Sequence, residues 1–508
     1  MLAKVHSAAL HGIEAHPVEV EVHIGNGDLR FVIVGLPDAA VRESQDRVRA
    51  ALANSGFQTS MGHTTVNLAP ADIKKEGPSF DLPIAIGLLS ASNQLASTSL
   101  QDFVLVGELA LNGALRPVRG VLAVALQAAA NHRRGLIVPI GNAAEAAVVR
   151  DVSVYPVSNL REAVDFLSGK IQIAPHHVDT HSLFEHDHSG APDMAEVKGQ
   201  ESAKRAIEIA AAGGHNLLLI GPPGTGKSML AKRLPAILPP LTLAEALETT
   251  KIHSVAGHLE PGEALVTRRP FRSPHHTSSD AGLLGGNAQP SPGEISLAHN
   301  GVLFLDELPE FRRSVLETLR QPLEDGRVTI SRAAGTMTFP ARFMLVAAMN
   351  PTPDGKMPAE SSSSPREIQN YLGRISGPLL DRIDLHLEMA PVKFRDLSEG
   401  LPGETSEVIR QRVVAARTRQ LARFRDSPTV QCNAHMGPRE LKTWCELDDI
   451  AHELLGAAMT ELNLSARAHD RILKVARTIA DLADAPNLTA EHVAEAVQYR
   501  SLDRQIWT

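Results

Sequence analysis

The chain has 508 residues, 43% of them hydrophobic and 21% charged, which is typical of a globular protein of about three domains. No apolar run approaches the roughly 18 residues of a membrane-spanning helix, and the N-terminus lacks a signal-peptide core, so we expect a cytoplasmic protein without membrane contact. Two cysteines argue against a disulfide scaffold and for a reducing compartment. With a net charge of -8 and 4% aromatic residues, any nucleic acid must be held by a local basic surface rather than by bulk charge or base stacking.

Residues 1–168 alternate between strand-like and helical patterns and are expected to form the first domain. Val18–Ile24 and Phe31–Val34 predict strands. Glu43–Asn54 predicts an amphipathic helix that ends near Gly56.

A linker is predicted at residues 169–195, because this stretch is polar, contains proline and glycine, and lacks an apolar period. Its histidines are expected to belong to a solvated tether, since nothing fixes the geometry of a metal site. They are His176, His177, His181, His186 and His188.

A phosphate-binding loop is predicted after the apolar strand Asn216–Ile220. Its glycines let backbone N–H groups turn towards phosphate oxygens, and the following helix directs its positive end at the same anion. Lys227 would bridge the β- and γ-phosphates of ATP, and the Ser228 hydroxyl would bind Mg²⁺. The loop residues are Gly221, Pro222, Pro223, Gly224, Thr225, Gly226, Lys227 and Ser228.

Two further apolar strands end in polar residues. Val302–Leu305 precedes Asp306 and Glu307, and an acidic pair at such a place is costly unless it serves a cation. Asp306 is expected to hold Mg²⁺, and Glu307 to orient and deprotonate the attacking water. Phe343–Met349 ends in Asn350, whose amide can polarise that water; alternatively, Asn350 simply begins a turn.

Two arginines are candidates for stabilising the transition state of phosphoryl transfer, where one arginine is worth about 10³–10⁵ in rate. Arg382 follows the third strand, and Arg467 begins a later helix. The alternative for each is a surface arginine paired with a local aspartate.

A hairpin is predicted within residues 324–339, because apolar residues alternate on both sides of Gly335. Arg327 and Arg332 are candidate DNA contacts there, with Arg332 near the tip; the alternative is an ion pair of Arg332 at a subunit interface. A second candidate for DNA contact is the insert that contains Arg269, Arg272, His275 and His276.

The rest of the chain, residues 392–508, is helical in pattern. Ser406–Phe424, Leu464–Asp484 and Thr489–Arg500 predict helices, each of the last two with a plausible cap. The α/β pattern before it, residues 196–391, predicts a nucleotide-binding domain.

Six segments resemble the magnesium chelatase-like AAA+ ATPases, specifically the ComM/YifB group, and the resemblance covers nearly the whole chain. The segments are Val197–Gln200, GPPGTGKS, residues 269–286, residues 292–311, Ala348–Pro351 and residues 375–386.

This resemblance implies a ring, a hexamer, with ATP between subunits. Arg382 would be the finger that reaches a neighbour's γ-phosphate, Arg467 the sensor on a helical lid, and Gly199 with Gln200 would lie beside the adenine. It also implies that the hairpin lines the pore, and that the protein is a helicase that drives branch migration while transforming DNA is integrated.

The first domain resembles the α+β proteolytic domain of Lon. Gly77-Pro78-Ser79 matches the segment of Lon's nucleophilic serine, but Leu122 stands in the place of its catalytic lysine. Because a serine needs a base to attack an amide, we expect this domain to be inactive as a protease.

Two metal sites are considered. Many relatives have a cysteine cluster in the loop at residues 351–365, and none is present here, so we expect no metal in that loop. Cys432, His435 and Cys445 form a partial zinc set, but packing and chance are the favoured interpretation. The competing functions are a chelatase subunit, an ATP-dependent protease and a remodeller of protein complexes.

Overall fold

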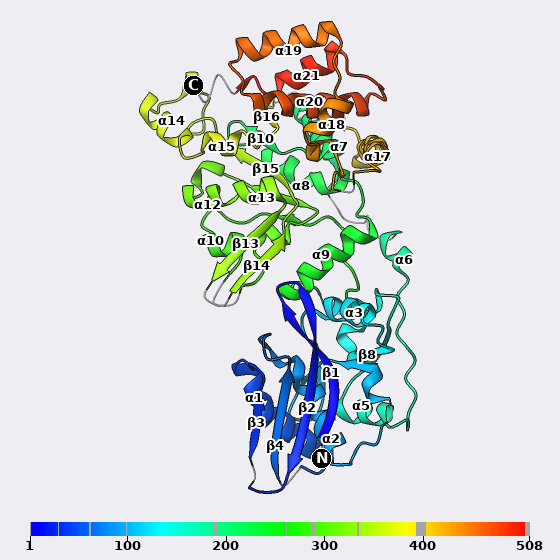
Figure 1. The fold of residues 1–508 in the computed structure, drawn as a ribbon. Helices are drawn as coiled ribbons and strands as arrows, with labels where there is room; N and C mark the ends of the chain where they lie inside the picture. Colours follow the sequence, from blue (N-terminus) through cyan, green and yellow to red (C-terminus); the bar gives the residue numbers. More distant parts are fainter. Residues whose placement is uncertain are drawn as a thin grey trace. The chain divides into compact units, whose positions relative to one another are not determined.

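The computed structural model describes residues 2–28, 30–59, 62–97, 99–185, 192–260, 262–286, 290–332, 335–392, 403–427 and 429–502. The chain folds into two compact units (Figure 1). Unit 1 comprises residues 1–187 and 243–267, and unit 2 comprises residues 188–242 and 268–508. Among the helices that these ranges contain, none has the length and apolarity needed to cross a bilayer.

Unit 1 is built on a seven-stranded mixed sheet of order β3-β4-β2-β1-β5-β8-β9. Strands β1, β2 and β4 pair antiparallel, whereas the remaining pairs are parallel. The strands are β1 (Leu2–His11), β2 (Glu14–Gly25), β3 (Phe31–Val34), β4 (His63–Ala69), β5 (Phe103–Leu105), β8 (Gly135–Pro139) and β9 (Ser153–Val157), with a separate ribbon of β6 (Glu108–Leu109) and β7 (Leu115–Arg116).

Helices cover both faces of this sheet because its central strands are apolar on both sides. In β5, Phe103 and Leu105 point into one core cluster and Val104 into the other. The first cluster contains α1, α2 and α5, and the second contains α3 and α4. The helices are α1 (Ala39–Asn54), α2 (Asp81–Ala91), α3 (Val121–Ala130), α4 (Ala143–Ala147), α5 (Leu160–Leu167), α6 (Thr180–Glu185) and α9 (Leu243–Ala256).

Most predicted elements of unit 1 are confirmed. The strand Phe31–Val34 has the predicted bounds, and the predicted Val18–Ile24 lies within β2. Helix α1 begins at Ala39 rather than Glu43, because the Asp38 side chain accepts a hydrogen bond from the Val41 N–H and so caps an earlier turn.

Helix α9 belongs to unit 1 although its sequence follows the phosphate-binding loop. Leu247 packs against the second core cluster, and the Ser254 hydroxyl bonds to the buried Glu145 carboxylate and accepts from the Gly120 N–H at 2.9 Å. We expected residues 196–391 to form one domain, whereas the structure groups residues 243–267 with unit 1. Helix α9 is therefore assigned to unit 1 by its packing and not by its position in the sequence.

The first half of the expected linker contains short structured elements. Helix α6 starts at Thr180, whose hydroxyl accepts a hydrogen bond from Arg150 at 2.8 Å, and His176 forms an isolated bridge with Val154. His176 and His177 are exposed, in agreement with a solvated tether, and the linker itself stays a prediction. His186 and His188 lie outside the described residues.

Unit 2 is built on a five-stranded parallel sheet of order β11-β12-β15-β10-β16. The strands are β10 (Leu217–Ile220), β11 (Phe271–Arg272), β12 (Val302–Leu305), β15 (Met344–Met349) and β16 (Leu385–Glu388). Its surrounding helices are α7 (Glu201–Gly213), α8 (Lys227–Ile237), α10 (Asp280–Leu284), α11 (Glu294–Leu297), α12 (Arg313–Thr318), α13 (Arg320–Asp325), α14 (Pro365–Leu372) and α15 (Gly377–Leu380).

The predicted hairpin is confirmed and forms its own two-stranded sheet. Strands β13 (Arg327–Arg332) and β14 (Gly335–Pro340) pair antiparallel, with Arg332 opposite Gly335. Within the hairpin, the side chains of Val328, Ile330 and Phe339 are buried.

The C-terminal part of unit 2 is helical, as predicted. The Arg471 guanidinium on α20 joins this helical part to the sheet by an ion pair with Asp384. Burial raises the pKa of Asp384, but Arg471, His215 and the Asn216 N–H together hold it well below its usual value. The helices are α17 (Ser406–Arg423), α18 (Pro438–Trp444), α19 (Asp449–Glu461), α20 (Ala466–Leu482) and α21 (Ala490–Gln498).

Candidate functional site

Three adjacent parallel strands bring the predicted catalytic residues to one edge of the sheet in unit 2. Strands β12, β15 and β10 are neighbours, and their carboxyl ends lead into Asp306, Asn350 and the loop at residues 221–226. Ligands of open α/β sheets bind outside such carboxyl ends.

The loop after β10 is shaped by glycine. Gly224 and Gly226 have φ of 81° and 91°, a region that favours glycine, and an added Cβ would meet no atom within 4 Å at either position. Lys227 then begins α8, so the helix N-terminus faces the loop. Open space beside a glycine-rich turn and a helix N-terminus is a place for a phosphate group.

Lys227 joins the loop to β15. Its ammonium donates to the carbonyl oxygens of Gly221 at 2.6 Å and Pro222 at 3.0 Å, and to the Asn350 side-chain oxygen at 3.3 Å. Burial lowers the pKa of Lys227, and the charge of Asp306 opposes this effect. All its described acceptors except the Asn350 amide are backbone carbonyls, so its charge is available to an anion.

Ser228 and Asp306 face each other, the hydroxyl donating to a carboxylate oxygen at 2.6 Å. The two predicted Mg²⁺ ligands therefore lie together. A hydroxyl and a carboxylate are oxygen ligands of the kind that Mg²⁺ prefers.

Glu307 has an unusual backbone, with φ of 54°, and a side chain that is 56% exposed. Its carboxylate lies 3.2 Å from Nδ1 of His276, which in turn contacts the ring of Phe311 edge-on at a centroid distance of 6.4 Å. His276 had been a candidate for DNA contact, and the structure places it beside the predicted general base instead. No sequence signal links these residues, which lie on different strand ends.

The Gln200 side chain is bonded to the phosphate-binding loop. Its side-chain amide donates to the Thr225 carbonyl at 3.1 Å and the Ala390 carbonyl at 2.8 Å. Gly199, with φ of 66°, precedes it. The predicted adenine-side residues are therefore attached to the phosphate-binding loop.

Arg382 does not meet the other candidate catalytic residues in the described part of this chain. The residue is 6% exposed, donates to the Pro378 carbonyl at 2.6 Å and forms an ion pair with Glu324 of α13. The sequence alone did not single out Glu324.

Arg467 lies in the first turn of α20, after the capping residue Ser465, and is exposed. Within the described residues it forms no hydrogen bond or ion pair.

Hydroxyl groups form a row on the exposed face of the hairpin. Thr329 bonds to Thr338 at 3.2 Å and Ser331 bonds to Thr336 at 2.7 Å, each pair across the two strands. Two exposed arginines, Arg327 and Arg332, are at the ends of β13.

Both arginines of the insert form hydrogen bonds to other parts of the chain. Arg269 donates to the carbonyl oxygens of Pro239 at 2.6 Å and Asn300 at 2.7 Å, and Arg272 forms two bonds of 2.7 Å to the Glu294 carboxylate. His275 stacks on His276 at a centroid distance of 4.1 Å. These contacts give both arginines of the insert partners within the fold, and contact of the insert with DNA stays a prediction.

The two Lon-like positions lie in unit 1. Ser79 is half-buried, and Leu122 is fully buried in the core, its N–H donating to the Glu145 carboxylate at 2.9 Å. The lysine's place is therefore filled by apolar packing.

The loop at residues 351–365 is organised by a carboxylate. Asp354 accepts hydrogen bonds from the hydroxyls of Thr352 at 2.7 Å, Ser361 at 2.8 Å and Ser362 at 2.9 Å, which hold the pKa of Asp354 well below its usual value.

The partial zinc set does not converge. Cys432 Sγ lies 3.4 Å from His435 Nδ1, whereas the Cys445 thiol donates to the Leu473 carbonyl at 3.7 Å. Burial raises the pKa of Cys445 to about 12. Across the described residues no group of three or more histidine, cysteine or acidic side chains is arranged for a metal.

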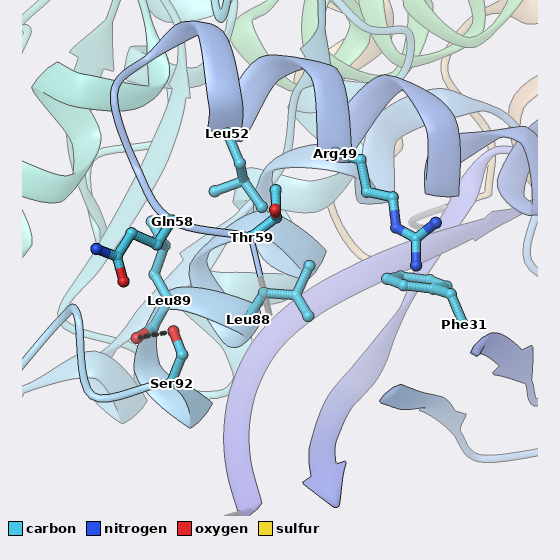
Figure 2. Close-up of a pocket in the computed structure, with 8 residues that line it drawn as sticks. All are labelled: Phe31, Arg49, Leu52, Gln58, Thr59, Leu88, Leu89 and Ser92. Carbon is cyan, nitrogen blue, oxygen red and sulfur yellow. Dashed lines mark hydrogen bonds between the residues drawn. The ribbon is translucent and has the colours of Figure 1, made fainter. Parts of the chain in front are cut away.

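Figure 2 shows a cavity of unit 1 with Arg49 over the ring of Phe31 at 5.5 Å from its centroid. Its volume is about 20 Å³. That space suits a single water molecule and is too small for a substrate.

Magnesium chelatase families match three parts of the chain. "Magnesium chelatase, subunit ChlI" matches residues 193–397, "Subunit ChlI of Mg-chelatase" matches residues 20–142, and "Magnesium chelatase, subunit ChlI C-terminal" matches residues 403–500.

Curated proteins match the chain along nearly its whole length. It is 48% identical to the competence protein ComM of Haemophilus influenzae, covering 99% of this chain and 98% of that protein. It is 46% identical to the uncharacterized protein YifB of Escherichia coli, with the same coverage. A magnesium-chelatase 38 kDa subunit of Cereibacter sphaeroides is 28% identical over 30% of this chain and 51% of its own length.

Proposed function

Because the chain belongs to the ComM/YifB family of magnesium chelatase-like proteins, we propose that it is an AAA+ ATPase that moves on DNA. The observation that carries the ATPase activity is the convergence of Lys227, Ser228, Asp306 and Asn350 at one sheet edge.

Each side chain has a role in phosphoryl transfer, which needs positioning and charge neutralisation. The loop N–H groups and Lys227 would hold the phosphates of ATP. Glu307, whose carboxylate is exposed, would orient the attacking water and take its proton. Asn350 would polarise that water while it contacts Lys227.

Mg²⁺ fits the pair formed by Ser228 and Asp306, which already share a hydrogen bond of 2.6 Å. When bound, it neutralises negative charge on the phosphates. Ser228, at the start of α8, and Asp306, after the end of β12, would hold it.

We further propose a ring, a hexamer, in which Arg382 and Arg467 complete the site. Arg382 would act on a neighbour's ATP, which agrees with its lack of contact to the described catalytic residues of its own chain. Arg467 has a free guanidinium within the described residues and would reach the γ-phosphate from the lid.

The hairpin is our candidate for the DNA contact. Arg327, Arg332 and the hydroxyl row on the exposed face supply donors suited to phosphate oxygens. Phosphate contacts of this kind hold DNA without reading its sequence. Branch migration during DNA integration, which the family resemblance implies, needs such a grip.

For the Lon-like domain we propose a role other than proteolysis. The buried Leu122 leaves Ser79 without the lysine that the resemblance would supply.

The direct test is ATP hydrolysis by the purified protein with and without forked or four-way DNA. We expect hydrolysis that DNA stimulates. A rate of hydrolysis that does not change with DNA would favour the alternative functions, a chelatase-type subunit or a remodeller of protein complexes. The similarity to the magnesium-chelatase subunit of Cereibacter sphaeroides supports the first alternative.

A further inference from the structure

The inference concerns the ion pair between Arg382 and Glu324. Arg382 is 6% exposed, and its guanidinium is shared between the Pro378 carbonyl and the Glu324 carboxylate. An arginine whose charge is neutralised by a carboxylate of its own chain is poorly prepared to stabilise a phosphate of another.

Glu324 is attached to the hairpin. It lies in the last turn of α13, which ends at Asp325; Gly326 follows with φ of 64°, and β13 begins at Arg327. Because so few residues separate the carboxylate from β13, a displacement of the hairpin moves Glu324 directly.

Glu324 also has room to move. Its side chain is 55% exposed and borders a polar cavity of about 550 Å³, together with Asp325, Gly326 and Arg342. Arg342, which follows β14, offers a second cation in this cavity. A half-exposed carboxylate is held by its partner far less tightly than a buried one, so the pair can separate.

We propose that Glu324 is a latch on the arginine finger: it holds Arg382 in the absence of DNA, and displacement of the hairpin by bound DNA releases Arg382 to the neighbouring ATP site. This inference rests on the proposed function. It assigns regulation to Glu324, which positions Arg382 and touches no reacting atom.

A purely structural role for the pair makes the opposite prediction. If Glu324 only supports the productive orientation of Arg382, its loss should lower hydrolysis both with and without DNA. If Glu324 is a latch, its loss should raise hydrolysis without DNA.

The experiment compares the ATPase rate of the full-length Glu324→Gln protein with and without forked DNA. We expect the rate without DNA to rise several-fold, the rate with saturating DNA to stay unchanged, and the stimulation ratio to fall. Glu324→Asp, whose shorter side chain reaches less far, should shift the ratio in the same direction and serves if the first variant is unstable. Asp325→Asn removes the neighbouring charge, which does not pair with Arg382, and should behave as wild type.

Arg382→Ala distinguishes failure of the arginine-finger assignment from failure of the latch. If that variant hydrolyses ATP normally, the finger assignment fails and the latch fails with it. If it is inactive but Glu324→Gln leaves the DNA-free rate unchanged or lowers it, the latch alone is refuted. The double variant Glu324→Gln/Arg382→Ala must be as inactive as Arg382→Ala, because a latch acts only through the residue that it holds.

Discussion

Two hydrogen-bonded pairs of side chains, Lys227 with Asn350 and Ser228 with Asp306, form within the chain itself. Lys227 contacts Asn350, and Ser228 contacts Asp306, so the start of α8, which follows β10, is bonded to the residues that follow both β15 and β12. Such preorganisation is what electrostatic catalysis requires, because the donors need not reorganise during the reaction.

Two substitutions distinguish binding from turnover at this network. Lys227→Ala should weaken nucleotide binding and abolish hydrolysis. Glu307→Gln should bind ATP as tightly as wild type and lose about 10²–10⁴ in kcat, because an amide cannot accept the proton. Binding of a fluorescent ATP analogue and steady-state hydrolysis measure the two properties. Normal turnover in Glu307→Gln would refute the assignment of the base.

His276 should matter through its contact with Glu307. His276→Ala should lower kcat about tenfold, which corresponds to about 1.4 kcal/mol, and leave KM for ATP unchanged, because the carboxylate loses its orienting partner. His275→Ala is the matched control, since in the described structure that ring stacks on His276 and bonds to Thr277. Equal effects of both substitutions would contradict a specific role for His276.

The motif residues of this site could be predicted because a strand, a turn and a helix fix Lys227 and Ser228 by local geometry. The partners His276 and Glu324 could not be predicted. His276 meets Glu307, and Glu324 meets Arg382, only after folding brings separate parts of the chain together. These contacts cannot be read from a single sequence.

The hairpin is the element whose sequence and structure agree most closely. Alternating apolar residues predicted it, and Val328, Ile330 and Phe339 are buried while the hydroxyls face outward. The exposed face therefore has Arg327 and four hydroxyls available to a phosphate backbone, whereas Arg332, at the tip end of β13, lies on the side of Val328 and Ile330.

Arg332→Ala tests the tip end of the hairpin. DNA binding should weaken equally for all sequences. The slope of log Kd against log salt concentration should fall by an amount that corresponds to about one phosphate contact per contacting subunit. Hydrolysis without DNA should persist. Arg439→Ala, which removes an exposed arginine of α18, is the control. Unchanged DNA affinity in the Arg332 variant would remove the hairpin from the interface.

Helix α9 supplies a pH-dependent prediction for unit 1. Burial raises the pKa of Glu145, which bonds to Ser254 of α9, above its usual 4.5. In the window above pH 4.5 the folded state then binds more protons than the unfolded state, so stability falls as pH rises.

Glu145→Gln should remove that dependence. Its melting temperature relative to wild type should increase as pH is raised from about 4.5 towards neutrality, measured by thermal denaturation at several pH values. Asp151→Asn, at an exposed carboxylate of unit 1, should give a constant difference. Parallel curves for Glu145→Gln and wild type would show that Glu145 does not titrate as inferred.

The sequence of α9 predicts a helix but does not predict that this helix packs in unit 1. Its helical character is local, but its partners are Glu145 and Gly120, more than a hundred positions earlier in the chain. Nothing in the segment itself specifies on which domain its apolar face will pack.

In the proposed ring, Arg382 of one chain completes the site that contains Glu307 of its neighbour. Mixing Arg382→Ala subunits with Glu307→Gln subunits should restore hydrolysis, because some interfaces then contain both intact residues. Each variant alone should be inactive. The measurement is ATPase activity of mixed rings, with subunit exchange demonstrated by differently tagged chains. Absence of rescue in rings shown to mix would argue against action between subunits.

The most direct test of the central claim is branch migration by the purified protein on a synthetic four-way junction with homologous arms. The account predicts that the wild-type protein converts the junction into two duplexes when ATP and Mg²⁺ are present, and that Glu307→Gln binds the junction but does not convert it. ATP hydrolysis with no conversion of the four-way junction, or equal conversion by Glu307→Gln, would contradict it.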